Sequence, residues 1–285
     1  MSPLPATITS ITNKKVKYVR SLHQRRVRYK ERRFIVEGLR LAEEALKAGA
    51  VPTLAFFTPD LSDSQRGREL LAAIESLTGE YFVVTEKVMG ALSDTVSPQG
   101  ILMVVPFVEL PVPANPWLVL VVDRVRDPGN LGTILRSAEA AGVSQVILTP
   151  STVDAYNPKV VRGAMGAHFH LPMATGISWS EITEALGNRQ ILLAEAKGDM
   201  VYYEVDWTKP SALIVGGEAE GASPEAKRLA TARVMIPMQG KAESLNVAVA
   251  ASVILFEAAR QRGAWARPNA HRELQRPVGR KPGPL

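Results

Sequence analysis

The sequence predicts an α/β protein built from two α/β domains. Short apolar segments rich in Val, Ile and Leu alternate with segments of helical spacing along most of the chain, as strands and helices do in α/β proteins. Residues 109–116 hold three prolines, which helix interiors and central strands reject, so we predict a linker there. At 285 residues, 46% of them apolar, the chain is long enough for two cores.

The N-terminal part, residues 1–108, is predicted to form a small α/β sandwich. Turn residues separate its elements; Gly49, for example, follows the helical pattern of Leu39, Ala42 and Leu46. Strands are expected at 34–36, 53–58, 81–85 and 100–106, and helices at 10–30, 37–48, 63–77 and 86–92.

A second α/β domain is predicted over residues 117–262, followed by a flexible basic tail over 263–285 that holds four prolines. His168 and His170 alternate on a predicted strand and are interpreted as sheet residues rather than metal ligands. Strands are expected at 117–122, 145–149, 168–172, 190–195, 212–215 and 234–236, and helices near 131–141, 158–165, 178–186, 223–230 and 244–262.

Composition excludes several classes of protein. The chain has no cysteine, which excludes disulfides, thiolate zinc sites and a cysteine nucleophile. No apolar run approaches the roughly 18 residues of a membrane-spanning helix, and the first residues lack the charged and apolar regions of a secretory signal. We therefore expect a cytoplasmic protein with no metal and no membrane partner.

Positive charge is concentrated near the two ends of the chain. Residues 14–33 hold ten basic residues and one acidic residue, although the whole chain carries only +6. Such one-sided charge is typical of a surface that neutralises phosphates, and we favour this interpretation over a solvated helix face. The candidate RNA-binding residues are Lys14, Lys15, Lys17, Arg20, Arg25, Arg26, Arg28, Arg32 and Arg33.

Three segments of the second domain lie at the carboxyl ends of predicted strands, the edge at which α/β sheets hold ligands. The first runs from Asp123 to Arg136 and contains a Pro-Gly turn followed by Asn130, which we expect to cap the next helix. Arg136 is expected about two turns into that helix. By itself, Arg136 is more simply explained by an ion pair at the surface.

The second segment, Gly216-Gly217-Glu218, ends a buried strand where missing side chains would let a ligand approach the backbone. Its glycine spacing fits neither the dinucleotide fingerprint nor the P-loop. In the third segment, Ser244 is expected to cap a buried helix, and Asn246 in the first turn must find hydrogen-bond partners. Taken singly, a tight turn and a helix cap explain these two segments equally well.

Together and in this order, the three segments carry a resemblance. The patterns D-x-x-x-D-P-G-N-L-G-x-I-x-R, G-x-E-x-x-G and I-P-M-x-G-x-x-x-S-L-N-V resemble the SpoU/TrmH family of RNA 2'-O-ribose methyltransferases, in the SPOUT superfamily. The resemblance covers residues 117–262. More loosely, the first third resembles the L30e-like substrate-binding domain of rRNA-directed members, and Ser97-Pro-Gln-Gly-Ile101 resembles its final strand.

The resemblance implies a deep trefoil knot in the catalytic domain, a homodimer, and S-adenosylmethionine as the cofactor. The residues that it places around the cofactor are Gly216, Gly217, Ile236, Met238, Ser244 and Leu245. The residues that match the polar active-site set of the family are Asn130, Arg136, Glu218, Ser244 and Asn246.

The chemistry implied is an in-line displacement that needs no covalent enzyme intermediate, which agrees with the absence of cysteine. Methylation at C5 of a pyrimidine usually needs a cysteine nucleophile and is disfavoured. Because an arginine is hard to deprotonate in a protein, we interpret Arg136 as an electrostatic stabiliser of the developing alkoxide rather than a base. Glu218 is expected to position Arg136 or relay the proton, and Asn246 and Ser244 to orient cofactor and hydroxyl.

The predicted substrate is ribosomal RNA, in particular 23S rRNA. A large appended N-terminal domain resembles the rRNA-directed branch, which includes antibiotic-resistance enzymes, more than the compact tRNA enzymes. Two alternatives stay open: a tRNA ribose methyltransferase, and an RNA-binding scaffold that has lost catalysis. Every motif position expected to act is occupied, which argues against the scaffold.

Overall fold

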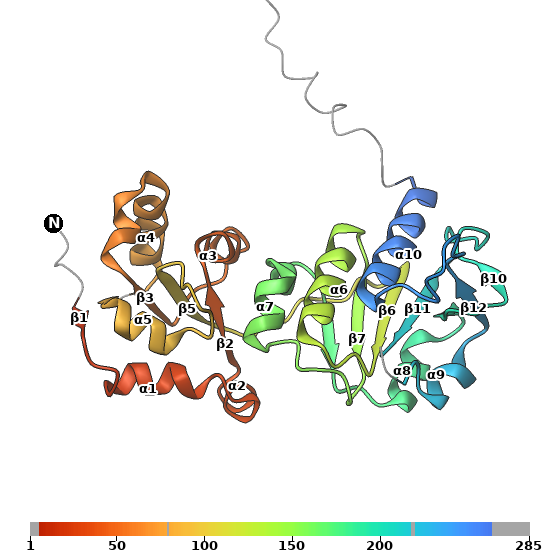
Figure 1. Cartoon of the computed structure of the whole chain (residues 1–285), viewed down its shortest axis with the longest axis horizontal. Coiled ribbons are helices and arrows are strands. Elements are labelled where there is room, and N and C mark those ends of the chain that lie inside the picture. Colours follow the sequence, from red (N-terminus) through yellow and green to blue (C-terminus); the bar gives the residue numbers. More distant parts are fainter. Residues whose placement is uncertain (1–5, 79, 218–219, 264–285) are drawn as a thin grey trace, which may run out of the picture.

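Two α/β sandwiches lie side by side in the protein (Figure 1). The structure, a computed structural model, describes residues 6–78, 80–217 and 220–263. Glu218 and, apart from Gly263, the predicted basic tail lie outside these residues. None of the helices within the described ranges is long and apolar enough to cross a membrane.

The N-terminal sandwich contains a five-stranded mixed sheet in the order β1-β4-β3-β5-β2. One face of this sheet packs on α1 and α5, and the opposite face packs on α3 and α4. The strands are β1 (Thr7–Ile8), β2 (Arg33–Glu37), β3 (Leu54–Phe57), β4 (Tyr81–Val84) and β5 (Ile101–Pro106). The helices are α1 (Lys14–Ser21), α2 (Arg25–Glu31), α3 (Leu39–Lys47), the 3-10 helix η1 (Pro59–Asp63), α4 (Gln65–Leu77) and α5 (Glu86–Leu92).

The C-terminal sandwich contains a seven-stranded sheet in the order β10-β12-β9-β11-β6-β7-β8, and every strand pair in it is parallel. Its strands are β6 (Leu118–Asp123), β7 (Gln145–Leu148), β8 (Met173–Thr175), β9 (Gln190–Ala194), β10 (Met200–Val201), β11 (Ser211–Gly216) and β12 (Ala232–Met235). Its helices are α6 (Pro128–Ala140), α7 (Pro158–Ala164), the 3-10 helix η2 (Ala167–Phe169), α8 (Trp179–Leu186), α9 (Pro224–Leu229) and α10 (Val247–Gln261).

Helices cover both faces of this parallel sheet. Alternate residues of β6 belong to different core clusters: Leu120 packs with α6, α7 and α10, and Val121 packs with α8 and α9. Burial on both faces explains why β6 reads as a continuous apolar run rather than an alternating one.

Three sequence predictions about the elements need correction. The basic helix expected at 10–30 is two helices, α1 and α2. The strand expected at 168–172 is wrong: Gly166 adopts a φ of +103°, and the Phe169 N–H donates to its carbonyl at 2.9 Å, which closes the 3-10 turn η2. The strand β8 begins only at Met173, and the two-residue strands β1 and β10 were not expected.

A buried ion pair joins the two sandwiches. Arg28 of α2 and Asp154, which lies between β7 and α7, are both buried, and the Arg28 guanidinium pairs with the Asp154 carboxylate. Its remaining Nη1 group donates to the carbonyls of Leu22 and His23 at 2.7 and 2.8 Å. The Tyr29 hydroxyl donates to Asp154 at 3.0 Å. The prediction that Arg28 contacts RNA is therefore corrected, because its guanidinium is buried and bonds to groups of the protein.

An aromatic cluster surrounds this ion pair. The rings of Phe107 and Tyr156 stack with centroids 3.7 Å apart, and His168 lies 5.5 Å from Tyr156. Complete burial lowers the pKa of His168 to about 4, so its ring is neutral at neutral pH. Its Nε2 lies 2.7 Å from the carbonyl oxygen of Ala155. Desolvation also raises the pKa of Tyr156 above its usual range.

Replacing Arg28 with methionine leaves the buried Asp154 carboxylate without its cation. We expect Arg28→Met to lower the free energy of unfolding by about 3–5 kcal/mol, the usual cost of breaking a buried pair. Urea denaturation measures this loss. Arg32→Met is the matched control, because Arg32 pairs with Glu109 at the surface, where such a pair contributes about 0–1 kcal/mol. Equal losses for the two variants would contradict the assignment.

Candidate functional site

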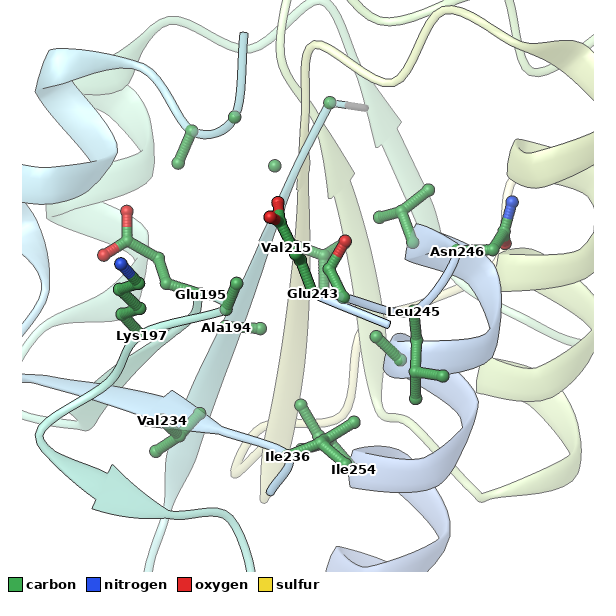
Figure 2. Close-up of a pocket in the computed structure, with 18 of the residues that line it drawn as sticks. Ala194, Glu195, Lys197, Val215, Val234, Ile236, Glu243, Leu245, Asn246 and Ile254 are labelled. Atoms are coloured by element: carbon green, nitrogen blue, oxygen red, sulfur yellow. The ribbon is translucent and has the colours of Figure 1, made fainter. Parts of the chain in front are cut away.

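A cavity of about 710 Å³ opens at the carboxyl ends of β9, β11 and β12. Figure 2 shows Glu195 and Lys197 on one side of it, and Leu245 and Asn246 on the other. All six predicted cofactor-binding residues line it: Gly216, Gly217, Ile236, Met238, Ser244 and Leu245. The structure therefore brings the second and third segments into one pocket.

Two glycines shape the rear wall of this cavity at the end of β11. A Cβ on Gly216 would lie 2.4 Å from the backbone nitrogen of Ala222, and one on Gly217 would lie 2.4 Å from the carbonyl oxygen of Arg124. Neither position has room for a side chain. The alternative of a tight turn, left open by the sequence, therefore applies to these glycines, because the chain itself needs them to fold back on β11.

A buried carboxylate holds the segment of chain that folds back on β11. Asp123, at the end of β6, accepts a hydrogen bond from the backbone N–H of Ser223 at 2.7 Å and another from the Thr149 hydroxyl at 3.1 Å. Ser223 in turn caps α9. Sequence reasoning used Asp123 only as the start of a motif, although a carboxylate ending a fully apolar strand signals a buried hydrogen-bonding role.

The first and third segments meet through two asparagine side chains. The Asn246 amide nitrogen donates to the Asn130 side-chain oxygen at 3.0 Å. The helix caps differ from those expected, because Asp127 rather than Asn130 caps α6, and Asn246 rather than Ser244 caps α10. Asn246 accepts from the backbone N–H of Ala248 at 2.9 Å, which fixes its amide nitrogen toward Asn130.

The structure does not bring every predicted catalytic residue to the cavity. Arg136 is exposed on α6 and does not line the cavity. Among the described residues, no carboxylate lies within ion-pair distance of its guanidinium. Glu218 lies outside the described residues. Ser244 and Asn246 line the cavity, and Asn130 bonds to Asn246 without lining the cavity itself.

Three charged side chains that sequence reasoning did not single out also line the cavity: Glu195, Lys197 and Glu243. Glu195 directly follows β9, so its position at the carboxyl end of a strand could have identified it. The other walls are largely apolar, with Val215, Val234 and Ile254 among them. The cavity volume falls in the range of about 300–1,000 Å³ that is usual for small-molecule sites.

Six of the nine predicted RNA-binding residues are exposed, on α1, on α2 or directly after α2. Lys14, Lys17, Arg20, Arg25, Arg26 and Arg32 are exposed. Lys15 pairs with Glu80, and Arg33 donates to the Tyr18 hydroxyl at 3.0 Å. These six exposed residues are called the basic face. Within the described ranges, no group of three acidic, histidine or cysteine side chains is arranged to hold a metal ion.

Comparison with known families gives two matches along the chain. Residues 117–256 match the SpoU rRNA Methylase family, and residues 13–103 match the MRM3-like substrate binding domain. Among curated relatives, rRNA methyltransferase 3, mitochondrial, of Mus musculus is 33% identical over 82% of this chain and 69% of its own length. The 23S rRNA (guanosine(2553)-2'-O)-methyltransferase RlmP of Bacillus subtilis is 34% identical over 87% of this chain and 97% of its own length.

Solved structures agree with these matches. The AdoMet-bound rRNA methyltransferase from Sinorhizobium meliloti superimposes with a TM-score of 0.77 and 34% identity, covering 89% of this chain and 97% of that one. AviRb from Streptomyces viridochromogenes, solved with AdoMet, gives a TM-score of 0.79 and 29% identity, covering 88% of this chain and 98% of that one. The resemblance inferred from the three motifs and the α/β fold are confirmed, and the trefoil knot stays a prediction. The chain belongs to the SpoU rRNA Methylase family.

Proposed function

We propose that this protein transfers the methyl group of S-adenosylmethionine to the 2'-hydroxyl of a ribose in ribosomal RNA, with 23S rRNA as the favoured substrate. The observation that carries the proposal is the cavity at the carboxyl edge of the parallel sheet. Two of the three motifs line it, and Asn246 bonds to Asn130 of the other motif. The names of the relatives, which are rRNA methyltransferases, support the choice of RNA.

The cavity fits the cofactor in size and in chemistry. Val215, Val234 and Ile236 provide apolar walls for the adenine ring of the cofactor. The charged side chains of the cavity suit the polar end of the methionine part of the cofactor. The backbone around Gly216, Ile236 and Leu245 would hold the adenosyl group. When bound, S-adenosylmethionine supplies a methyl group on a cationic sulfur, which an oxygen nucleophile displaces in line.

The polar residues of the three motifs orient the ribose hydroxyl so that it can act as a nucleophile. One N–H of the Asn246 amide bonds to Asn130, so its second N–H is left to donate toward a substrate oxygen. Ser244, two residues earlier, lines the same cavity with a hydroxyl group. The guanidinium group of Arg136 is assigned to stabilise the charge that develops on the ribose oxygen.

Replacing Arg136 with alanine tests this assignment. We expect Arg136→Ala to lower the rate of tritium transfer from S-adenosylmethionine to rRNA by at least about a hundredfold, as loss of one electrostatic stabiliser does. Calorimetric titration should show nearly unchanged cofactor binding, because Arg136 does not line the cavity.

Arg260→Ala is the matched control, since Arg260 is an exposed arginine in the last turn of α10. Loss of cofactor binding in Arg136→Ala would show a structural role instead. Binding without transfer to any RNA in the unmodified chain would favour a scaffold, and transfer to tRNA alone would contradict the choice of substrate.

The basic face is proposed to bind the RNA backbone. We expect replacement of Arg25, Arg26 and Arg32 by glutamate to weaken rRNA binding and to flatten its dependence on salt, because fewer counterions are released. Filter binding over a series of salt concentrations measures both effects. The matched control reverses Arg40, Lys47 and Arg68, which are exposed on α3 and α4 of the same sandwich. Equal weakening by both sets would rule out a specific face.

A homodimer, implied by the family resemblance, is also part of the proposal. Leu245 and Val249 are 37% and 48% exposed beside Asn246, where a second copy of the chain would cover them. We expect light scattering to give twice the 30.9 kDa chain mass and Val249→Asp to shift the protein toward monomer. A monomer at micromolar concentration in the unmodified protein would contradict this. A cytoplasmic location completes the proposal.

A further inference from the structure

Glu195 lies on the cavity wall at the carboxyl end of β9, the strand that pairs with β11. We propose that its carboxylate accepts hydrogen bonds from the ribose hydroxyls of the bound cofactor. This inference rests on the proposed function, because it assigns a residue to the cofactor of that reaction. It adds a specificity-determining residue that none of the three sequence motifs contains.

Two cations flank Glu195 from outside the cavity. Lys227 Nζ lies 3.6 Å from one carboxylate oxygen, and Arg233 Nη1 lies 3.6 Å from the other. Neither Lys227 nor Arg233 lines the cavity. These separations are longer than hydrogen bonds, so the cations compensate the charge of the carboxylate without occupying its lone pairs.

The carboxylate of Glu195 is thus a preformed acceptor. Its side chain is 21% exposed, and no hydrogen bond joins its carboxylate to another side chain or backbone group of the described residues. An ionised carboxylate has only acceptor sites, so its partner on a ligand must be an N–H or O–H donor. Carboxylates at strand ends of α/β sheets accept from ribose hydroxyls in this way.

The two cations that flank Glu195 make it better suited to bind the ribose than the cationic part of the cofactor. Because Lys227 and Arg233 already balance its charge, Glu195 gains little from a third cation but still benefits from neutral hydroxyl donors. Glu243 is different: it lines the cavity next to Ser244 and has no ion pair among the described residues. Glu243 therefore suits the cationic end of the cofactor, and Glu195, which Figure 2 shows beside Lys197, suits the ribose.

A cycle of protein variants and ligand analogues tests the assignment. Calorimetry would measure binding of S-adenosylhomocysteine and of its 2'-deoxy and 3'-deoxy ribose analogues to the unmodified protein and to Glu195→Ala. We expect the unmodified protein to lose on the order of tenfold or more in affinity for at least one deoxy analogue, the loss of a charge-assisted hydrogen bond. In Glu195→Ala, the analogue and the parent ligand should bind alike.

Glu225→Ala is the matched control, because Glu225 is a carboxylate on α9 outside the cavity, and it should keep the full ratio of affinities. Glu195→Gln, which preserves volume, decides the question if the alanine variant does not fold, and its ratio should fall severalfold. An unchanged ratio in the Glu195 variants, or no penalty for either analogue in the unmodified protein, would overturn the inference alone. Absence of any binding of S-adenosylmethionine or S-adenosylhomocysteine would overturn the proposed function with it.

Discussion

The buried carboxylate of Asp123 is the contact on which the cavity depends. It ties the end of β6 to the chain that returns from β11, through the Ser223 N–H, and to the end of β7, through Thr149. That return brings the backbone so close to β11 that Gly216 and Gly217 have no room for a side chain. Because a buried carboxylate without these donors would cost free energy, the hydrogen bonds and the close backbone contacts fix one shape for the rear wall.

The second constraint is the buried joint between the sandwiches. Arg28 and Asp154 come from different sandwiches and satisfy each other in a region where water is excluded. The stacked rings of Phe107 and Tyr156 fill the space beside them. A neutral His168 completes this cluster. The joint therefore sets how the basic face of α1 and α2 is oriented relative to the cavity, which is what a separate substrate-binding surface requires.

Most elements could be predicted from apolar periodicity, because the strands of the parallel sheet are buried on both faces and read as uninterrupted apolar runs. The burial of Arg28 could not be predicted, since its partner Asp154 is 126 residues away and a basic run looks the same whichever member turns inward. The caps of α6 and α10 are not the residues predicted, because Asp, Asn and Ser are equally good caps. Tertiary contacts determine which of them caps the helix. The motifs located the cavity, but they gave Asp123 no role beyond the start of the first motif and they did not include Glu195. The roles of both residues depend on neighbouring strands.

The central claim is that this fold delivers a methyl group to one kind of atom, a ribose 2'-oxygen in ribosomal RNA. Mapping ribose methylation across ribosomal RNA from cells with and without the protein tests it most directly. We predict a ribose position that carries a 2'-O-methyl group only when the protein is present. An unchanged ribose map, or a protein-dependent methyl group on a base instead, would contradict it.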